Sequence, residues 1–513
     1  MEKLSVLLSA LIVFCANTVF AQNSNNNLIF KDTTNRIILV VSDESSKATL
    51  LSGKRLNNST PFAQKIFNEL NCPFYESLIR INQCSRNFSS NNFGPNALFL
   101  SKNEGGFPRH GLLVKDEEKD FEYPNLNFVD LVVSENMFKN GALSIYSHEL
   151  GHVMMMNIME DFPNKKTSKQ HVSMGVTDYF TAFSEGWGIH FQRFGFDNIP
   201  LYKNGFERMF DPNKTNKLWH SSSDENMRIN TVFNNGYIYK KLLPTNIDLD
   251  SLTAEQTILL EHTSTIFDFT KLKNAQQMLS CEGVLATIFY RINSDTVLQN
   301  KFQNIEFYNK FLQSPIPNGV SPKDIFSPFE NIMLKNFWVW NKIKTRDFSK
   351  DQILISFIEE WCNSFPEDKN QLLTLFISIT VGKTVDRSLG DIFEKMSWYG
   401  NIGDINKYMY YRKIYNEIFL KLGKEVISDI RLLGKNIGPE LWIENSNVPV
   451  RTTLWDEKRK KPLNVNINTA SEYEIASFWK MDISKAKLFI KKRDEIGYYK
   501  SFEEAASYGY TFN

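Results

Sequence analysis

The sequence predicts an α+β protein whose character changes along the chain. Short apolar runs separated by Gly, Pro and Asn occupy residues 22–139, which predicts a small lobe of strands and helices. Residues 140–385 carry apolar side chains at helical spacing, so this region is expected to be mostly helical. A connecting region at 386–460 leads to a distinct tail at 461–513. With 513 residues, the chain is long enough to bury several hydrophobic cores.

The net charge and the N-terminus limit the class of protein. There are 59 Lys and Arg against 58 Asp and Glu, so no overall field favours nucleic acid or an anionic membrane as the main partner. Lys3 precedes an apolar run at 4–14, and Ala21 ends a stretch suited to signal-peptidase cleavage. We therefore expect residues 1–21 to be a signal peptide and the mature protein to be secreted or periplasmic. No later apolar run approaches the length of a membrane span, and nothing in the sequence indicates an oligomeric state.

The N-terminal lobe is predicted from its apolar runs. Residues 36–42 (R-I-I-L-V-V-S) predict a buried strand, and residues 60–78 predict mainly helix, opened by Ser59 or Thr60. Three further short strands are expected at residues 96–101, 111–115 and 128–134. One of these strands could lie beside the helix expected at 142–160 and bind an extended peptide by strand addition, or the sheet could serve only for packing.

Four cysteines remain after the signal peptide, and the sequence leaves their pairing open. Cys72 and Cys84 could close a short disulfide loop in an exported protein. Alternatively, these two, together with Cys281 and Cys362, are unpaired buried thiols. The four cysteines lack the second C-x-x-C or the histidine pair of a structural zinc site.

The strongest chemical motif is the run H-E-L-G-H, in which His148 and His152 flank Glu149. Histidines four residues apart lie on the same face of a helix, so both imidazoles can reach one Zn²⁺. The glutamate between them is placed to act on a water bound to that metal. A surface helix with two unrelated histidines is the alternative. Apolar residues around the motif instead indicate a buried helix at 142–160, in which histidines need partners.

A zinc hydrolase needs a third protein ligand and one open position. A metzincin would have Gly at position 155 and His at position 158, whereas the chain has Met155 and Ile158, which excludes that class. A carboxylate from a second helix is the other common solution. Glu185 lies in the run S-E-G-W-G of the next predicted helix, where Gly186 and Gly188 are expected to let that helix approach the first one closely.

These motifs resemble the gluzincin metallopeptidases, in which H-E-x-x-H is followed by a helix with an E-G-W-A-like signature. The resemblance implies a zincin-like fold and a zinc-dependent metallopeptidase acting on peptide or protein substrates. It implies that His148, His152 and Glu185 bind the zinc. Glu149 would be the general base, which takes a proton from the zinc-bound water and passes it to the leaving amine. Thirty-two residues separate His152 from Glu185, more than in the best-known members, which leaves room for a loop at 161–176.

Glu185 has rivals as the third ligand. Glu282, in the run S-C-E-G-V, has a similar local sequence and is the main rival. His171 and His190 are weaker candidates, because each is more readily interpreted as a structural histidine. The helices expected farther along, at residues 337–343, 351–365 and 369–381, complete the helical region and carry no candidate ligand.

A zinc peptidase also needs a donor that stabilises the oxyanion formed on the scissile carbonyl. Two aromatic segments, 234–239 and 283–291, are expected to be helix-like and contain several possible donors. The candidates there and among the nearby histidines are Tyr237, Tyr239, Tyr290, Arg291, His220 and His262. Each could equally be a core side chain, and the preference goes to Tyr237 because it follows a glycine.

Residues 463–505 resemble the helix-hairpin-helix module of bacterial competence DNA receptors. The run N-I-N-T-A-S is followed by a helix, a hairpin and A-x-x-I-x-x-R-x-x-x-G, and the scaffold matches are Asn466, Asn468, Ala470, Ala486, Ile490, Arg493 and Gly497. Lys480 and Asp482 stand where the family has two hairpin glycines, which let backbone N–H groups approach a phosphate. We therefore expect a degenerate module that packs on or docks to protein and binds DNA no better than a generic basic patch.

Together these features predict a secreted zinc-dependent metallopeptidase with a zincin-like α+β fold and Zn²⁺ as its cofactor. One alternative is a catalytically inactive zincin-fold protein that attaches to nucleic acid or to a partner through its tail. The intact motif counts against this alternative, since loss of activity would usually be accompanied by loss of Glu149. A zinc hydrolase acting on a non-peptide amide is the second alternative.

Overall fold

The structure is a computed structural model of the chain. It describes residues 37–43, 50–89, 94–103, 105–117, 119–133, 143–160, 176–177, 179–199, 202, 238–240, 267–272, 275–348, 352–380, 392, 395, 398–399, 402–414, 417, 454–456, 461–470, 472–496 and 499–511. The predicted signal peptide lies outside these residues. None of the described helices is both long and apolar enough to cross a membrane.

The chain divides into two compact units, each assembled from separate stretches of sequence. Unit 1 consists of Met1–Phe162, Phe191–Glu207 and Asn293–Lys344. Unit 2 consists of Pro163–His190, Arg208–Ile292 and Thr345–Asn513. The domain boundaries expected from the sequence near residues 139, 385 and 460 stay predictions.

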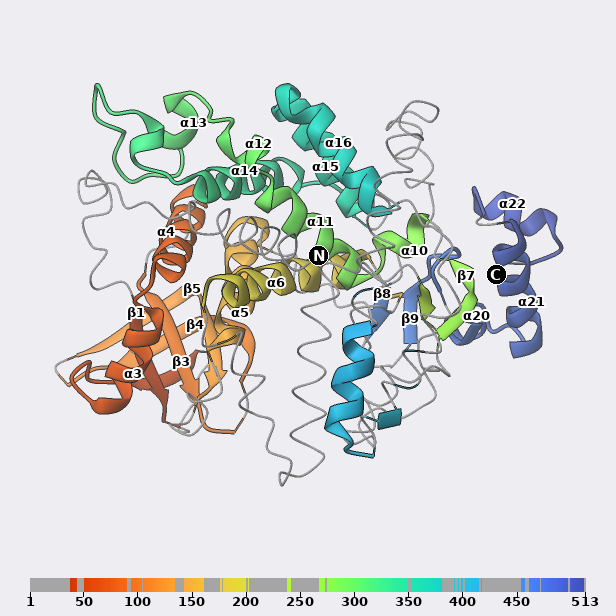
Figure 1. Ribbon diagram of the computed structural model, residues 1–513, viewed down its shortest axis with the longest axis horizontal. Coiled ribbons are helices and arrows are strands. Elements are labelled where there is room, and N and C mark those ends of the chain that lie inside the picture. The colour runs from red at the N-terminus through yellow and green to blue at the C-terminus, as the bar shows by residue number, and fades with distance from the viewer. Residues whose placement is uncertain are drawn as a thin grey trace, which may run out of the picture. The chain divides into compact units, whose positions relative to one another are not determined.

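Unit 1 contains a five-stranded sheet that closes on itself, made of β1 (Ile37–Ser42), β2 (Leu51–Arg55), β3 (Asn96–Ser101), β4 (Phe107–Lys115) and β5 (Asp120–Val132). The strand order is β1-β2-β4-β5-β3, and a parallel pair between β3 and β1 closes the ring (Figure 1). The pairs β1–β2 and β4–β5 are antiparallel, whereas β2–β4 and β3–β5 are parallel. The four strands expected from the sequence are therefore confirmed, with β4 and β5 longer than predicted.

The fifth strand, β2, was not predicted, because its sequence L-S-G-K-R lacks the alternation of a half-buried strand. Its place in the sheet depends on Gly53. A Cβ atom there would lie 2.6 Å from the carbonyl oxygen of Val41 and 2.7 Å from a side-chain carbon of Val40, closer than real Cβ atoms come. Leu51 of β2 packs partly buried against the core of the sheet. Apolar side chains from β1, β3, β4 and β5 form this core: Val40, Ala97, Phe99, Leu112, Val114, Leu126 and Phe128.

The helix expected at 60–78 is instead two helices, α3 (Pro61–Leu70) and α4 (Pro73–Phe88). Thr60 caps the first, since its side chain accepts the N–H of Ala63. Pro73 explains the break: proline disfavours helical backbone in the residue before it and fits the first position of a new helix.

No disulfide joins any of the four cysteines, which decides against the Cys72–Cys84 pair that the sequence left open beside unpaired thiols. Cys72 precedes α4 and Cys84 lies within it, twelve residues later. At 1.5 Å per residue, the helix holds them about 18 Å apart, far beyond the roughly 7 Å that a disulfide can span. Cys84 and Cys281 are buried, whereas Cys72 and Cys362 are partly exposed.

The remaining helices of unit 1 are α5 (Ser144–Met159), α12 (Thr296–Asn300), α13 (Ile305–Asn309) and α14 (Pro328–Ile343), with a short 3₁₀ turn, η6 (Pro322–Asp324). α5 packs against β4, β5, α4 and α14. It confirms the helix expected at 142–160. α14 begins nine residues earlier than predicted, because Pro328 and the cap before it start a helix that its apolar pattern alone did not show.

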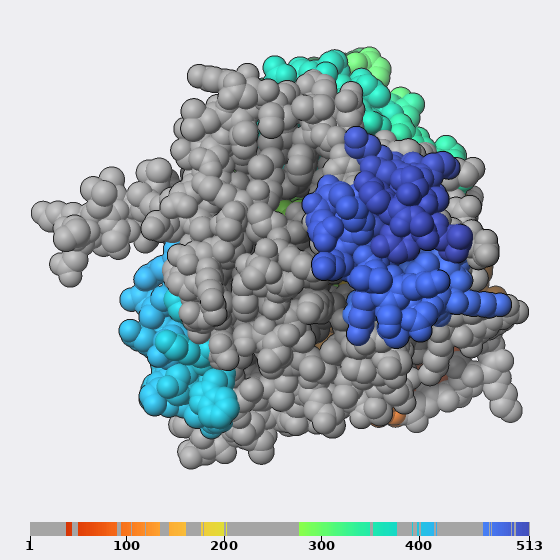
Figure 2. All heavy atoms as spheres, turned by 90° about the vertical axis from the view of Figure 1, so that its right-hand side faces the viewer, coloured from red at the N-terminus to blue at the C-terminus, as the bar shows by residue number. Residues whose placement is uncertain are grey.

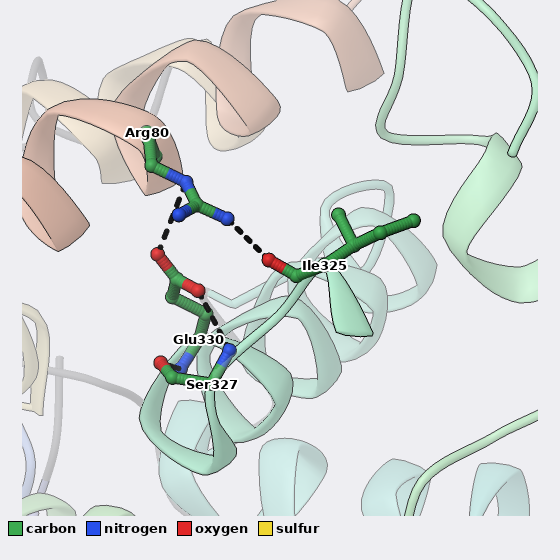
Figure 3. A network of polar contacts seen from close by, with 4 residues as sticks. All are labelled: Arg80, Ile325, Ser327 and Glu330. Carbon is green, nitrogen blue, oxygen red and sulfur yellow. Dashed lines mark hydrogen bonds and ion pairs between the residues drawn. The ribbon is translucent and has the colours of Figure 1, made fainter. Parts of the chain in front are cut away.

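One buried ion pair joins α4 to α14 (Figure 3). Ser327 and Glu330 form a capping box, in which the Glu330 carboxylate accepts the N–H of Ser327 at 2.8 Å. The same carboxylate lies 3.3 Å from Nε of Arg80, and Nη2 of Arg80 donates to the carbonyl oxygen of Ile325. The two charged side chains are only 12% and 2% exposed, so removing either one would leave a buried charge without its counter-ion.

Unit 2 is built on α10 (Ala275–Leu279), α11 (Glu282–Ser294), α15 (Ile353–Ser364), α16 (Lys369–Thr380) and the first part of α6 (Tyr179–Asn198). Aromatic side chains hold these helices together. The ring of Phe289 lies 5.1 Å from those of Phe183 and Trp187 and 5.7 Å from that of Phe357, in edge-to-face arrangements that add to the free energy of burial. α6, α15 and α16 confirm predicted helices.

Two small antiparallel pairs complete the described strands: β6 (Ile238–Lys240) with β7 (Phe267–Leu272), and β8 (Leu454–Asp456) with β9 (Lys461–Asn464). The expectation that 234–239 is helix-like is therefore wrong for Ile238 and Tyr239. A branched and an aromatic residue in succession favour a strand once a partner strand is present, and only the fold supplies β7.

The tail contains α20 (Glu472–Trp479), α21 (Ile483–Ile496) and α22 (Phe502–Ser507), and the first two confirm the helices expected on either side of the hairpin. Its buried residues form one cluster: Val465, Ile467, Ala470, Ile475, Ala486, Phe489, Tyr499 and Ala505. In the space-filling view the described residues of the tail form one compact mass (Figure 2, blue). The tail therefore has a hydrophobic core of its own.

Candidate metal centre

The helix that carries the motif, α5, is buried almost all round and is fixed at its first turn. Its N-cap is Leu143, whose side chain cannot accept a hydrogen bond from the first backbone N–H groups of the helix. Instead, the hydroxyl of Tyr75 donates to the Leu143 carbonyl at 2.9 Å, and the hydroxyls of Tyr75 and Tyr202 are 2.6 Å apart. Burial raises the pKa of Tyr75 well above its ordinary value, so this hydroxyl stays protonated and available as a donor.

The two motif histidines point at a common position. Their Nε2 atoms are 3.1 Å apart and their ring centroids 4.8 Å apart. Two imidazole nitrogens bound to one tetrahedral Zn²⁺, at bond lengths of 2.0–2.1 Å, would be about 3.3 Å apart. The pair His148 and His152 therefore fits two corners of a zinc site. His152 is buried and His148 partly exposed, as expected for a centre that a substrate must reach.

Glu149 lies on the same turn of α5 as His148 and His152. With about 100° of rotation per residue, it lies roughly 100° from His148 and roughly 60° from His152 around the axis. The side chain is only 6% exposed. A largely buried carboxylate beside two imidazoles can act on a water held between them and has few competing waters around it.

Glu185, on α6, belongs to the same group. His148, His152 and Glu185 each offer one ligand atom, and these atoms all lie within 4.8 Å of one another. In the described part of the chain this is the group of three such side chains that could hold a metal ion. Two imidazoles and one carboxylate are the ligand set of zinc hydrolases that keep a fourth position open.

The rival ligands are placed elsewhere. Glu282 is buried at the start of α11 and is not part of the group. His190 is fully buried, its Nδ1–H donates to the carbonyl of Trp187, and its ring lies 4.3 Å from that of Trp187. It is a structural histidine, as the sequence favoured. His171 lies outside the described residues.

The expectation for Gly186 was wrong in its partner. A Cβ atom on Gly186 would lie 2.6 Å from Cβ of Leu285, 2.8 Å from the N of Ala286 and 3.0 Å from the carbonyl oxygen of Glu282. The glycine therefore lets α6 approach α11, not α5.

The oxyanion donor is not identified among the described side chains. Tyr237, the preferred candidate, lies outside them, as do His220 and His262. Tyr239 belongs to β6, where only the backbone is described. Of the two candidates on α11, Tyr290 packs against Ile189 and Ala286, and Arg291 is exposed.

Comparison of the chain with protein-family models, with curated proteins and with solved structures found no match. Two nitrogens at the spacing of zinc ligands, a third ligand atom within 4.8 Å and the buried carboxylate of Glu149 on the same helix can bind a divalent metal and accept a proton beside it.

Proposed function

We propose that this protein is an exported, zinc-dependent metallopeptidase with a zincin-like fold. The observation that carries the proposal is the group formed by His148, His152 and Glu185, with ligand atoms all within 4.8 Å of one another. This ligand set suits Zn²⁺, which takes nitrogen and oxygen ligands in a tetrahedral arrangement and leaves one position for water.

In this proposal each motif residue has one task. His148, His152 and Glu185 would hold the zinc, which when bound polarises the scissile carbonyl and lowers the pKa of water to about 7. Glu149 accepts the proton of the attacking water and donates it to the leaving amine. Its burial supports the second step, because a carboxylate shielded from bulk water keeps the proton for the substrate.

The closed sheet offers a place for an extended peptide beside α5. β2 pairs with β4 only over residues 112–115, so the first half of β4, residues 107–110, pairs with β5 on one side and with none of the described strands on the other. A peptide lying along this edge would receive main-chain hydrogen bonds by strand addition. α5 packs against β4, which supports a substrate path towards the motif.

The test combines metal analysis with a proteolysis assay on the mature protein. The proposal expects close to one zinc per chain, hydrolysis of casein that stops when a chelator is added, and no bound zinc after His148→Ala and His152→Ala. Stoichiometric metal in the double variant would contradict the assignment. Zinc binding without hydrolysis would favour the inactive binding protein instead. N-terminal sequencing of exported protein tests the signal peptide, which predicts a start at Gln22.

A further inference from the structure

α5 lacks a feature that would normally fix the rotation of a helix about its axis. Thirteen of its sixteen residues are buried, on nearly every side. Burial of apolar surface is non-directional, so it stabilises the helix in many rotations about equally. A metal centre needs the rotation of its helix to be set much more accurately than this. Rotating α5 by about 20° would move an atom roughly 6 Å from the axis by about 2 Å, whereas zinc–ligand distances tolerate about 0.2 Å.

One polar residue on α5, Asn157, is placed to fix the rotation of the helix about its axis. Asn157 is only 2% exposed, and its side-chain amide forms hydrogen bonds with Asn82, Ser85 and Asn127. Its Nδ2 donates to Oδ1 of Asn82 at 3.1 Å and to Oγ of Ser85 at 2.8 Å, both on α4. Its Oδ1 accepts from Nδ2 of Asn127, on β5, at 2.9 Å. The amide nitrogen of Asn157 therefore binds α4, and its oxygen binds β5.

The network continues to a residue that fixes which way every amide points. Nδ2 of Asn82 donates to Oδ1 of Asn96 at 2.6 Å, and Nη2 of Arg86 donates to the same oxygen at 2.7 Å. A guanidinium can only donate, so it requires an oxygen there. Asn82 must then donate to Asn96 and present its own oxygen to Asn157. At the other end, Nδ1 of His110 is 2.7 Å from Oδ1 of Asn127.

The network holds the side of α5 that faces away from the ligands. Asn157 follows His148 by nine residues and His152 by five, which places it roughly 180° and 140° from them around the axis. Rotating the helix would break all three bonds of Asn157 and leave buried polar groups of α4 and β5 unsatisfied, which is costly. The hydrogen bonds of Asn157 thus set the rotation of α5 from the side opposite the two histidines.

We propose that Asn157 is a positioning residue, which sets the rotation of α5 and thereby aims His148 and His152 at one metal ion. This inference rests on the proposed zinc function and adds a residue to it. Substitution of such a supporting residue typically lowers metal affinity 10–100-fold, because the ligands remain but no longer converge.

The main test is Asn157→Leu, which replaces the amide with an apolar group of similar size. We expect the dissociation constant for zinc to rise by about 10–100-fold and the visible spectrum of the cobalt-substituted protein to change, while the protein stays folded at the assay temperature. If Asn157→Leu does not fold, Asn127→Ala removes one of the three bonds at the edge of the network. It should give a smaller change in the same direction.

Asn331→Leu is the matched control. Asn331 is also a fully buried asparagine of unit 1, on α14, and its side chain bonds to Tyr308, Gln299 and Lys301. We expect it to lower Tm comparably but to leave zinc affinity within about twofold of the wild type. Wild-type affinity and cobalt spectrum in Asn157→Leu or Asn127→Ala would overturn the inference, as would equal loss in Asn331→Leu. Wild-type protein that binds no zinc would instead overturn the proposed function itself.

Discussion

The motif helix α5 and the C-terminal tail both contain short polar motifs, but they keep different kinds of residue. On α5, the side chains that could bind a metal and transfer a proton are present: two imidazoles with nitrogens 3.1 Å apart and a buried glutamate that lies between them in sequence. In the tail, residues that match the helix-hairpin-helix pattern, such as Asn468, are buried, whereas Lys480 and Asp482 stand at the two positions where that pattern would have glycine.

The scaffold matches of the tail have clear structural tasks. Arg493 is fully buried, and its Nη1 donates to the carbonyl oxygens of Ile467 and Ala470 at 3.2 and 2.8 Å. Asn468 exchanges two hydrogen bonds with the backbone of Tyr499, at 2.8 and 2.7 Å. These bonds tie the segment before α20 to α21 and to the chain after it. They give Arg493 and Asn468 structural roles within the tail.

The hairpin is changed in both of its expected glycine positions. Lys480 has φ of 50°, a backbone conformation that favours glycine. Oδ1 of Asp482 accepts the N–H of Ser484 at 2.8 Å, at the start of α21. The carboxylate therefore occupies the helix N-terminus that would receive a phosphate. The comparison teaches that a motif has to be judged by the atoms that its function needs, not by the number of matching positions.

The largest expected effect concerns the base on α5. Glu149→Gln should keep zinc, because no ligand is lost, but lower kcat for casein by about 10²-fold or more, since an amide cannot accept the proton of water. Zinc content and hydrolysis are measured on the same preparation. Cleavage at the wild-type rate would mean that the intact motif around α5 is structural, as in the tail.

The next prediction compares the two E-G dipeptides. Glu185→Ala should weaken zinc binding by more than the 10–100-fold typical of a supporting residue, because it removes a ligand. Glu282→Ala should leave zinc affinity near that of the wild type, although loss of a buried carboxylate will lower Tm. Weakened binding in Glu282→Ala alone would transfer the ligand role to α11.

The tail can be tested by restoring its hairpin in the full chain. Wild-type protein should bind duplex DNA no better than a generic basic patch, with Kd of roughly 10⁻⁴ M or weaker at physiological salt. Lys480→Gly with Asp482→Gly frees the N–H groups of α21 and removes a negative charge. We expect about tenfold tighter binding. Micromolar binding by the wild type that Lys485→Glu abolishes would show that the changed hairpin still works.

The smallest expected effects are opposite pH dependences of stability in the two regions. Burial raises the pKa of Glu69, on α3, despite a hydrogen bond from Tyr202, whose hydroxyl lies 2.6 Å from that of Tyr75. Stability therefore falls as pH rises from the unfolded pKa, about 4.3, through the folded one. Glu69→Gln should raise the urea midpoint at pH 8, and this gain should shrink towards pH 4.

Asp482 in the tail should behave in the opposite way. The hydrogen bond from the N–H of Ser484 lowers its pKa, so its stabilising effect is present above the unfolded pKa, about 3.9, and is lost as pH falls through the folded one. Asp482→Asn should therefore lower the urea midpoint at pH 8 by an amount that shrinks towards pH 3. Changes of the same sign in both variants would contradict the assigned causes.

The sequence by itself determined the local elements and the centre of the site. Strand β3 and helices α5, α15 and α21 follow from apolar periodicity, which depends only on residues close in the chain. The spacing of His148 and His152 fixes them on one helix face for the same reason. The sequence also shows that Lys480 and Asp482 stand where hairpin glycines were expected. A side chain at such a position restricts the backbone conformation of the hairpin in any fold.

Tertiary structure decided what depends on partners distant in sequence. The strand β2 has no pattern of its own and exists because β1 and β4 pair with it. Gly186 meets α11 about a hundred residues later, and Asn157 finds its partners on α4 and β5. A hydrogen bond or close contact acts over a few ångströms in space, and a short stretch of sequence does not record which distant residues the fold brings there.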